Sequence, residues 1–139
     1  MKDISIEEAL EQGVYTKFTE RGNGEFVYRL IGKDNSVYIR CEVKTDCFGN
    51  AHYHKYCHES FLIQSGTLYL FMMVDGQLEV KKLQAGQQVI VEPEIPHTTF
   101  MREGTVLHAI KFGECYENDW YGVEELNTLA REWENNKCK

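Results

Sequence analysis

The stretch that decides the fold is His52-Tyr53-His54-Lys55-Tyr56-Cys57-His58-Glu59, which is followed, after six further residues, by Gly66. On an extended strand alternate side chains point to the same side, so His52 and His54 project together. Four residues separate His54 from Glu59, which leaves room for a tight turn that returns a carboxylate beside the two imidazoles. Such a set holds a divalent first-row metal and leaves coordination positions open. His97, after Pro96, is a candidate third imidazole.

On both sides of this stretch, short runs of β-branched and aromatic residues are separated by turns that contain glycine. These runs predict eight strands, at Phe26–Ile31, Ser36–Lys44, Glu59–Gln64, Thr67–Val74, Gln77–Leu83, Gln88–Glu92, His97–Arg102 and Thr105–Phe112. The step Asp75–Gly76, between two apolar runs, is the strongest hairpin signal. Many short strands without intervening helices predict an antiparallel barrel or sandwich over about residues 25–113.

Helical patterns flank this β region. Residues 5–12 read as a short helix that begins with the capping box Ser5-x-x-Glu8, and we expect its apolar face, Ile6, Ala9 and Leu10, to pack on the domain. Residues 122–135 read as a second helix with apolar residues at i, i+3, i+4 and i+7, from Leu126 to Trp133. We expect this stripe either to close the barrel or to line a contact between subunits.

Composition excludes several classes of protein. The chain has 139 residues, with 15 Lys+Arg against 22 Asp+Glu, and its net charge of −7 argues against nucleic acid and anionic membranes as partners. No apolar run approaches the ~20 residues of a membrane-spanning helix, and the first residues do not resemble a secretory signal. Five cysteines without a paired spacing indicate free thiols: Cys41, Cys47, Cys57, Cys115 and Cys138. We therefore expect a single cytoplasmic domain, residues 1–139, with a small-molecule partner.

The histidine-rich stretch resembles the first cupin motif, in which HxH, three or four residues, Glu, six residues and Gly follow in order. His52, His54, Glu59 and Gly66 match without a gap, although Asp46 stands where the motif opens with Gly. The second cupin motif maps onto residues 86–101, where its Gly and His positions are Gly86 and His97. Its Pro, Gly and Asn are replaced, in that order, by Glu92, Glu94 and Met101.

This resemblance implies an all-β protein with an antiparallel cupin-type β-barrel, also called a double-stranded β-helix or jelly roll, between short terminal helices. It implies that His52, His54, Glu59 and His97 bind one divalent transition-metal ion, with Fe, Mn, Zn and Ni all open. It further implies a metal-dependent enzyme that acts on a small oxygenated metabolite, by sugar-type isomerase or epimerase chemistry or by oxygenase (dioxygenase) chemistry. The alternative is a non-catalytic cupin that binds or senses a small ligand. Barrels of this size often form homodimers, and we expect one here.

Strand parity suggests further site residues. If Lys111 faces water, His108 points into the barrel as a candidate catalytic acid or base; the alternatives are a hydrogen-bonded core histidine or one exposed by a bulge. By the same parity Arg40 should face outward; with the opposite parity it could bind a carboxylate or phosphate. Cys57 and His58 are expected at the barrel mouth. The remaining pocket candidates are apolar and would line or wall the cavity: Phe61, Ile63, Tyr69, Phe71 and Phe100.

Overall fold

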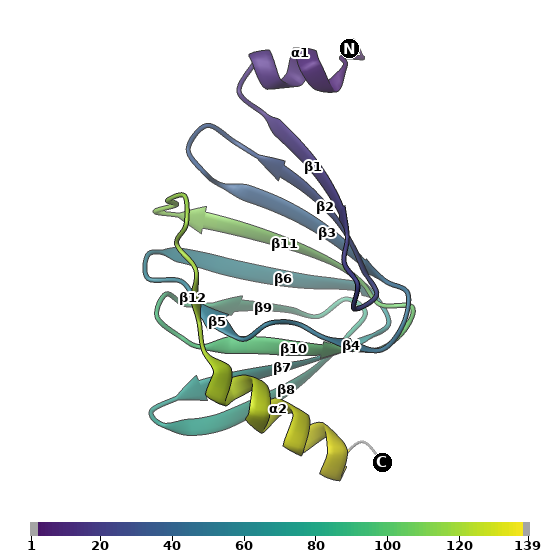
Figure 1. Ribbon diagram of the computed structural model, residues 1–139, viewed down its shortest axis with the longest axis vertical. Helices are drawn as coiled ribbons and strands as arrows, with labels where there is room; N and C mark the ends of the chain where they lie inside the picture. The colour runs from purple at the N-terminus through teal and green to yellow at the C-terminus, as the bar shows by residue number, and fades with distance from the viewer. Residues whose placement is uncertain (1–2, 138–139) are drawn as a thin grey trace.

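A computed structural model describes residues 3–137 as two antiparallel sheets that face each other (Figure 1). The first sheet has the order β1-β2-β3-β11-β6-β9, and the second has the order β12-β5-β10-β7-β8, with β4 paired to β10. The strands are β1 Tyr15–Glu20, β2 Glu25–Ile31, β3 Val37–Val43, β4 Cys47–Phe48, β5 His52–Tyr53, β6 Cys57–Ser65, β7 Thr67–Val74, β8 Gln77–Gln84, β9 Gln88–Val91, β10 His97–Met101, β11 Val106–Gly113 and β12 Tyr121–Gly122. The helices are α1 Ile6–Glu11 and α2 Glu124–Lys137.

The sequence-based prediction of an antiparallel β architecture with short terminal helices is confirmed. Each of the eight predicted strands is present with its ends shifted by no more than two residues. The Asp75–Gly76 turn joins β7 and β8, and both residues have positive φ, 51° and 77°, as this hairpin signal requires. Four strands were not predicted: β1, and the two-residue strands β4, β5 and β12, which are too short to carry a readable alternation.

The main core lies between the two sheets. It is built from alternate residues of β2, β3, β6, β7 and β11, including Val27, Ile63, Leu70 and Leu107. Opposite residues of the first sheet point outward, and they include large apolar side chains that stay exposed. This sheet therefore has one face against the core between the sheets and one face toward solvent, and neither helix of residues 3–137 covers that outer face (Figure 1).

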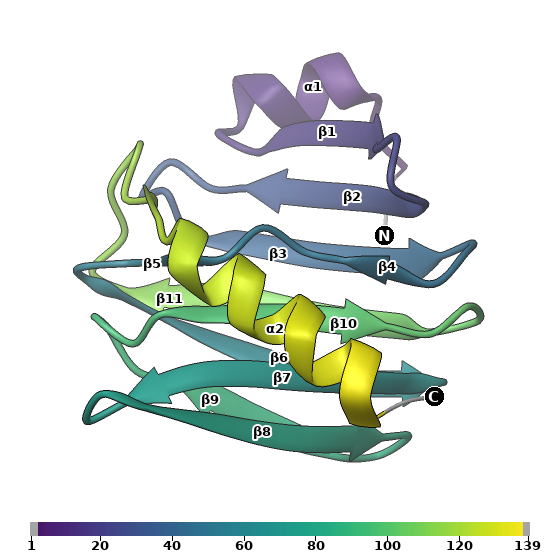
Figure 2. The same cartoon turned by 60° about the horizontal axis from the view of Figure 1, so that its bottom comes forward.

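A second core lies on the outer face of the other sheet, where α2 crosses β7 and β10 (Figure 2). Leu126 and Ala130 of α2 are completely buried, and Trp133 packs against Tyr69 and Phe71. The apolar stripe of this helix is thus used to cover its own sheet. The helix begins two residues later than predicted.

The short helix α1 lies beside β1 at one end of the first sheet (Figure 1). Its capping box is present, with the Ser5 hydroxyl accepting from the Glu8 backbone N–H at 3.1 Å. The prediction that its apolar face packs on the domain is wrong, because Ile6 and Leu10 are 61% and 56% exposed. A six-residue helix at a sheet edge reaches only the neighbouring strand.

Two further expectations concern cysteines and membranes. Cys41, Cys47, Cys57 and Cys115 are free thiols, and Cys138 lies outside the described residues. Among residues 3–137, no helix has the length and apolar character needed to cross a bilayer.

Candidate metal centre

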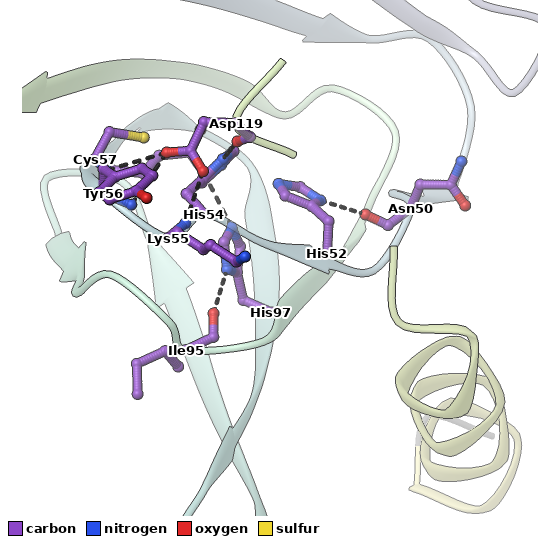
Figure 3. Close-up of polar contacts among 10 residues, drawn as sticks. Asn50, His52, His54, Lys55, Tyr56, Cys57, Ile95, His97 and Asp119 are labelled. Atoms are coloured by element: carbon purple, nitrogen blue, oxygen red, sulfur yellow. Dashed lines mark hydrogen bonds and ion pairs between the residues drawn. The ribbon is translucent and has the colours of Figure 1, made fainter. Parts of the chain in front are cut away.

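The fold brings together the four ligands named from the sequence. His52 lies on β5, His54 in the turn that follows, Glu59 on β6 and His97 on β10. His97 is the register partner of His52, so the two imidazoles come from adjacent strands. One ligand atom from each of the four residues lies within 4.8 Å of all the others. Figure 3 shows the three imidazoles grouped in this way.

Each imidazole is oriented by a hydrogen bond from Nδ1 to a backbone carbonyl. His52 bonds Asn50 O at 2.7 Å, His54 bonds Asp119 O at 2.5 Å and His97 bonds Ile95 O at 2.9 Å (Figure 3). A carbonyl only accepts, so Nδ1 carries a proton and Nε2 is the nitrogen that faces the other ligands. Burial, followed by the charge of His97, lowers the pKa of His52 to about 3, which favours the neutral ring.

The Nε2 atoms of His54 and His97 converge on the carboxylate of Glu59. Oε1 of Glu59 lies 3.0 Å from Nε2 of His97 and 3.6 Å from Nε2 of His54. Burial alone would raise the pKa of the Glu59 carboxyl, but the contacts with both imidazoles outweigh it and hold the pKa well below its usual value. Nε2 of His54 is buried without a hydrogen-bond partner. An ionised carboxylate only accepts, so His97 Nε2 donates to Glu59, and a cation bound between the Nε2 atoms and the carboxylate would replace that proton and give Nε2 of His54 a partner.

The donor set therefore fits one divalent transition-metal ion. Three imidazole nitrogens and one carboxylate oxygen suit zinc, iron, nickel or manganese, and they leave positions for a substrate. Such an ion supplies Lewis-acid chemistry, or redox chemistry if it is iron or manganese. The hydrogen bonds that Nδ1 of each ring donates to a backbone carbonyl fix the orientation of the ligand rings before a metal binds.

A residue that the sequence analysis missed, Asp119, organises the turn between His54 and Glu59. Its carboxylate accepts from the backbone N–H groups of Lys55 at 2.8 Å, Tyr56 at 3.1 Å and Cys57 at 3.4 Å (Figure 3). Its own carbonyl orients His54. Asp119 comes more than sixty residues after these partners in the chain, so no local pattern could connect it to them.

Three of the four candidate ligands, His52, Glu59 and His97, line a cavity of about 650 Å³ between the sheets, and His54 lies behind them on a smaller cavity. Phe61, Leu107 and Ala109 contribute apolar lining. The indole of Trp120, next to Asp119, stacks on His52 with a centroid distance of 5.3 Å. The cavity is large enough for a small organic molecule, and it presents the ligand cluster at one side.

Four cationic side chains line this cavity, and two of them are already engaged. Arg21 pairs with Glu25 at 2.8 Å, and Arg131 lies over the ring of Phe48 at 4.5 Å. The side chains of the other two, Arg29 and Lys111, are in no hydrogen bond or ion pair with a residue between 3 and 137, although the charge of each interacts with that of Glu59. The expectation that Lys111 faces water is wrong, since a lysine stem can lie along an apolar wall.

The orientation of β11 corrects the prediction for His108. Leu107, Ala109 and Lys111 line the cavity, so His108 lies on the opposite, outer face. Its ring nitrogens bond the Tyr38 hydroxyl and Oε1 of Gln64, each at 2.6 Å. A register shift between Val106 and Leu107 marks a β-bulge, so the alternative of an outward histidine beside a bulge describes this strand better. Arg40 also faces outward as predicted, and it pairs with Glu42.

The predicted pocket residues are divided among different places. Phe61 lines the cavity, whereas Ile63 is buried in the core between the sheets. His58 pairs with Glu92 at 2.9 Å and stacks on Phe112 away from the cavity. The placement of three aromatic residues in the cavity wall is wrong, because they lie beneath α2: Tyr69, Phe71 and Phe100. The alternation could not distinguish the two faces of β7 and β10 because both are covered.

Cys57 lines a smaller cavity of about 200 Å³ together with Lys111 and Cys115. His54, Cys57 and Asp119 also lie close enough together to form a possible metal cluster. The Asp119 carboxylate is already occupied by three backbone N–H groups. We therefore assign this second cluster to support of the first site.

Fold and site together define an all-β metal-binding protein with the cupin fold. Solved structures similar to this chain include oxalate decarboxylase from Bacillus subtilis, with a TM-score of 0.67 and 13% identity over 85% of this chain and 34% of that one. A variant of that enzyme matches with the same TM-score over 87% and 37%. An oxalate oxidase matches with a TM-score of 0.61 and 15% identity over 75% of this chain and 57% of that one.

At these identities the likeness shows the fold alone. The chain spans about a third of the length of the oxalate decarboxylase chains it matches. No family model and no curated protein matches the sequence. The residues of the site must therefore carry any functional argument.

Proposed function

We propose that this protein is a metal-dependent enzyme that acts on a small organic acid. The observation that carries the proposal is the cluster of three imidazoles and the Glu59 carboxylate, of which His52, Glu59 and His97 line a cavity of about 650 Å³. A structural metal site is normally closed by its protein ligands, whereas a site beside a cavity keeps positions for a substrate. The likeness to oxalate decarboxylase and oxalate oxidase supports the choice of an acid.

The position of Lys111 supports an anionic substrate. Lys111 is the register partner of Glu59 on the neighbouring strand, so their Cβ atoms lie about 5 Å apart on the cavity side. No salt bridge joins its ammonium group to a carboxylate among residues 3–137, although its charge helps to lower the pKa of the Glu59 carboxyl. An acid bound at the open metal positions would bring its negative charge to this ammonium group. In this proposal Lys111 orients the acid and the apolar lining excludes water.

Of the two reaction types considered from the sequence, oxygenase chemistry fits better than an isomerase, and the likeness to oxalate decarboxylase adds decarboxylation of an acid as a third. A sugar isomerase or epimerase needs a protein group that moves a proton between carbons. His108, the candidate for that role, lies outside the cavity. Glu25, an acidic group of the lining, is paired with Arg21. These placements favour a reaction in which the bound ion would activate the substrate and no protein side chain has to move a proton between carbons.

Metal loading and turnover, measured on the same samples, test this proposal. Metal-free protein is reconstituted separately with Mn²⁺, Fe²⁺, Ni²⁺ and Zn²⁺, its metal content is measured, and oxalate and other short carboxylates are offered with and without oxygen. We expect near-stoichiometric metal and loss of at least one acid. His54→Ala should lose both metal and turnover, whereas His108→Gln, on the outer face, should keep both.

Two outcomes would contradict the proposed function. Metal content that stays at background in the wild type after reconstitution would remove the metal centre. Stoichiometric metal and tight binding of an acid without turnover would instead support the alternative, a non-catalytic ligand-binding cupin.

We also propose that the protein forms a homodimer through the outer face of the first sheet. Leu30, Ile110 and Ile90 follow one register row across this face, with Tyr38 and Ser60 between them. The three aliphatic side chains are 44–50% exposed. The apolar stripe of α2 is buried against its own sheet. The outer face of the first sheet therefore becomes the candidate contact between subunits. Exposed large aliphatic side chains gathered on one sheet face are a common sign of a protein contact.

A further inference from the structure

The cavity contains one cation that the proposed chemistry leaves unused. Arg29 lies on β2 with its side chain on the cavity side, and it is half-buried. Burial, and then the charge of Arg21, lower the pKa of its guanidinium from the usual value, and the charges of Glu25 and Glu59 offset this only in part. A partly desolvated guanidinium without a hydrogen-bonded anion costs free energy unless a ligand provides one.

The sheet register places Arg29 across the cavity from the metal ligands. Arg29 pairs with Ile39, Ile39 with Ala109 and Ala109 with Phe61. Phe61 is two residues from Glu59 on the same face of β6, so Arg29 lies three strand spacings, roughly 14 Å, from the strand that carries the metal ligand. Its side chain and the ligand cluster thus approach the cavity from opposite ends.

The surface between these two ends is apolar. Ile39, Ala109 and Phe61 are the side chains along the row from Arg29, and all of them line the cavity. The alanine leaves more room above the sheet than a longer side chain would. A site with metal-binding groups at one end, an apolar middle and a guanidinium at the other matches a molecule with two acidic ends and a short carbon chain.

We propose that Arg29 binds a second carboxylate of the substrate, remote from the metal centre, so that the site selects short dicarboxylates over monocarboxylates. This inference rests on the proposed function, since it assumes an acid bound at the metal. The guanidinium suits the role because its planar fork can bind both oxygens of a carboxylate. Lys111, next to Glu59, serves the metal-bound end in the same arrangement.

Isothermal titration with two acids that differ only at the remote end tests the inference. The probes are 2-oxopentanedioate and 2-oxopentanoate, which present the same 2-oxo acid head, and the protein is loaded with Zn²⁺, which is redox-inert. We expect the wild type to bind the dicarboxylate roughly 10- to 100-fold more tightly, the range for a charged hydrogen-bonded contact. Arg29→Gln should lose this preference, and Arg29→Lys should keep part of it.

Arg40→Gln is the matched control. Arg40 lies on the adjacent strand but on the outer face, where it pairs with Glu42, so its removal should leave the preference unchanged. Thermal unfolding of each variant checks that the fold is retained. The inference is overturned if the wild type shows no preference for the dicarboxylate, including no binding of either acid, or if the preference survives in Arg29→Gln.

The measurement separates this inference from the proposed function because it needs no turnover. An Arg29-dependent preference in a protein that converts no acid would support the subsite and count against the enzyme. Turnover of short acids without any preference would support the enzyme and overturn the subsite.

Discussion

Asp119 serves the metal centre through two different groups. Its backbone carbonyl fixes the ring of His54, and its carboxylate gathers three consecutive N–H groups of the turn that leads to Glu59. Burial would raise the pKa of the Asp119 carboxyl, but these N–H groups outweigh it and lower the pKa below its ordinary value. Asp119 thus supports two metal ligands, contacting His54 directly through its carbonyl and reaching Glu59 only through the turn that its carboxylate holds.

Asp119→Asn is expected to weaken metal binding without removing a ligand. The carbonyl that orients His54 remains, but the amide replaces one accepting oxygen with a donor that faces backbone N–H groups. We expect the metal affinity to fall roughly 10- to 100-fold, the usual effect of losing an outer contact of a metal ligand. Competition with a chelator of known affinity measures this change.

Glu117→Gln, an exposed position in the same segment, provides the control and should bind metal as the wild type does. Asp119→Asn should also lose about 1–3 kcal/mol of unfolding free energy in the metal-free state. A loss of stability with unchanged metal affinity would contradict the positioning role and leave Asp119 as a structural turn residue.

At the residue scale, local spacing was sufficient to name the four ligands, because all but His97 lie within eight residues. Asp119 and Arg29 could not be found in this way. Their roles depend on which strands become neighbours and on which cations already have partners. Lys111 led to a wrong choice of the inward face of β11, because charge alone does not determine which face of a strand a long side chain occupies.

At the scale of elements, Asp46 links two turns. Oδ1 accepts from the backbone N–H of Glu103 at 2.7 Å, and Oδ2 accepts from Arg102 at 3.0 Å. These contacts join the turn before β4 to the turn between β10 and β11. Asp46 is the position at which the sequence departs from the opening glycine of the cupin motif, so the structure gives this departure a physical role.

The stabilising effect of Asp46 should depend on pH. The N–H of Glu103 first, and Arg102 second, lower the pKa of this carboxyl from its ordinary value of 3.8. The ionised form is favoured in the folded state, so its contribution is present above pH 3.8 and is lost as the pH falls through the lowered pKa. Asp46→Asn should therefore unfold more readily than the wild type at pH 7, by less than about 1 kcal/mol because the pair is exposed.

Urea unfolding of both proteins from pH 7 to pH 3 checks this expectation. The difference in unfolding free energy should be constant down to about pH 4 and then shrink. A difference that grows on acidification would show that Asp46 stabilises the fold in its protonated form, contrary to the structure.

The positions of the strands were predictable because each strand is bounded by turn residues. Which face of each strand points inward was not predictable. On β11 the alternation was clear and the choice of the inward face was wrong. On β7 both faces are buried, one between the sheets and the other beneath α2 (Figure 2). Covering a sheet with a helix from the far end of the chain removes the contrast on which the pattern depends.

At the scale of the whole molecule, the two sheets differ in what covers their outer faces. One has α2, and the other has an exposed row that crosses five strands and includes Ile110 at its centre. Arg40 and Glu42 lie on the same outer face, so a two-fold contact could place opposite charges of two copies against each other. An isologous dimer needs only such a self-complementary face.

The proposed homodimer predicts the behaviour of a single substitution at this centre. Ile110→Lys places two like charges close to the two-fold axis of the contact, and we expect it to convert a dimer at micromolar concentration into a monomer. Sedimentation velocity measures the change, and circular dichroism checks the fold.

Tyr116→Lys is the control, since this exposed residue lies in the segment between β11 and β12 and not on the row. A wild type that sediments as a monomer, or an Ile110→Lys variant that remains a dimer, would exclude this face as the subunit contact. Because Ile110 points away from the cavity while its neighbours Ala109 and Lys111 line it, the variant should retain its metal even as a monomer.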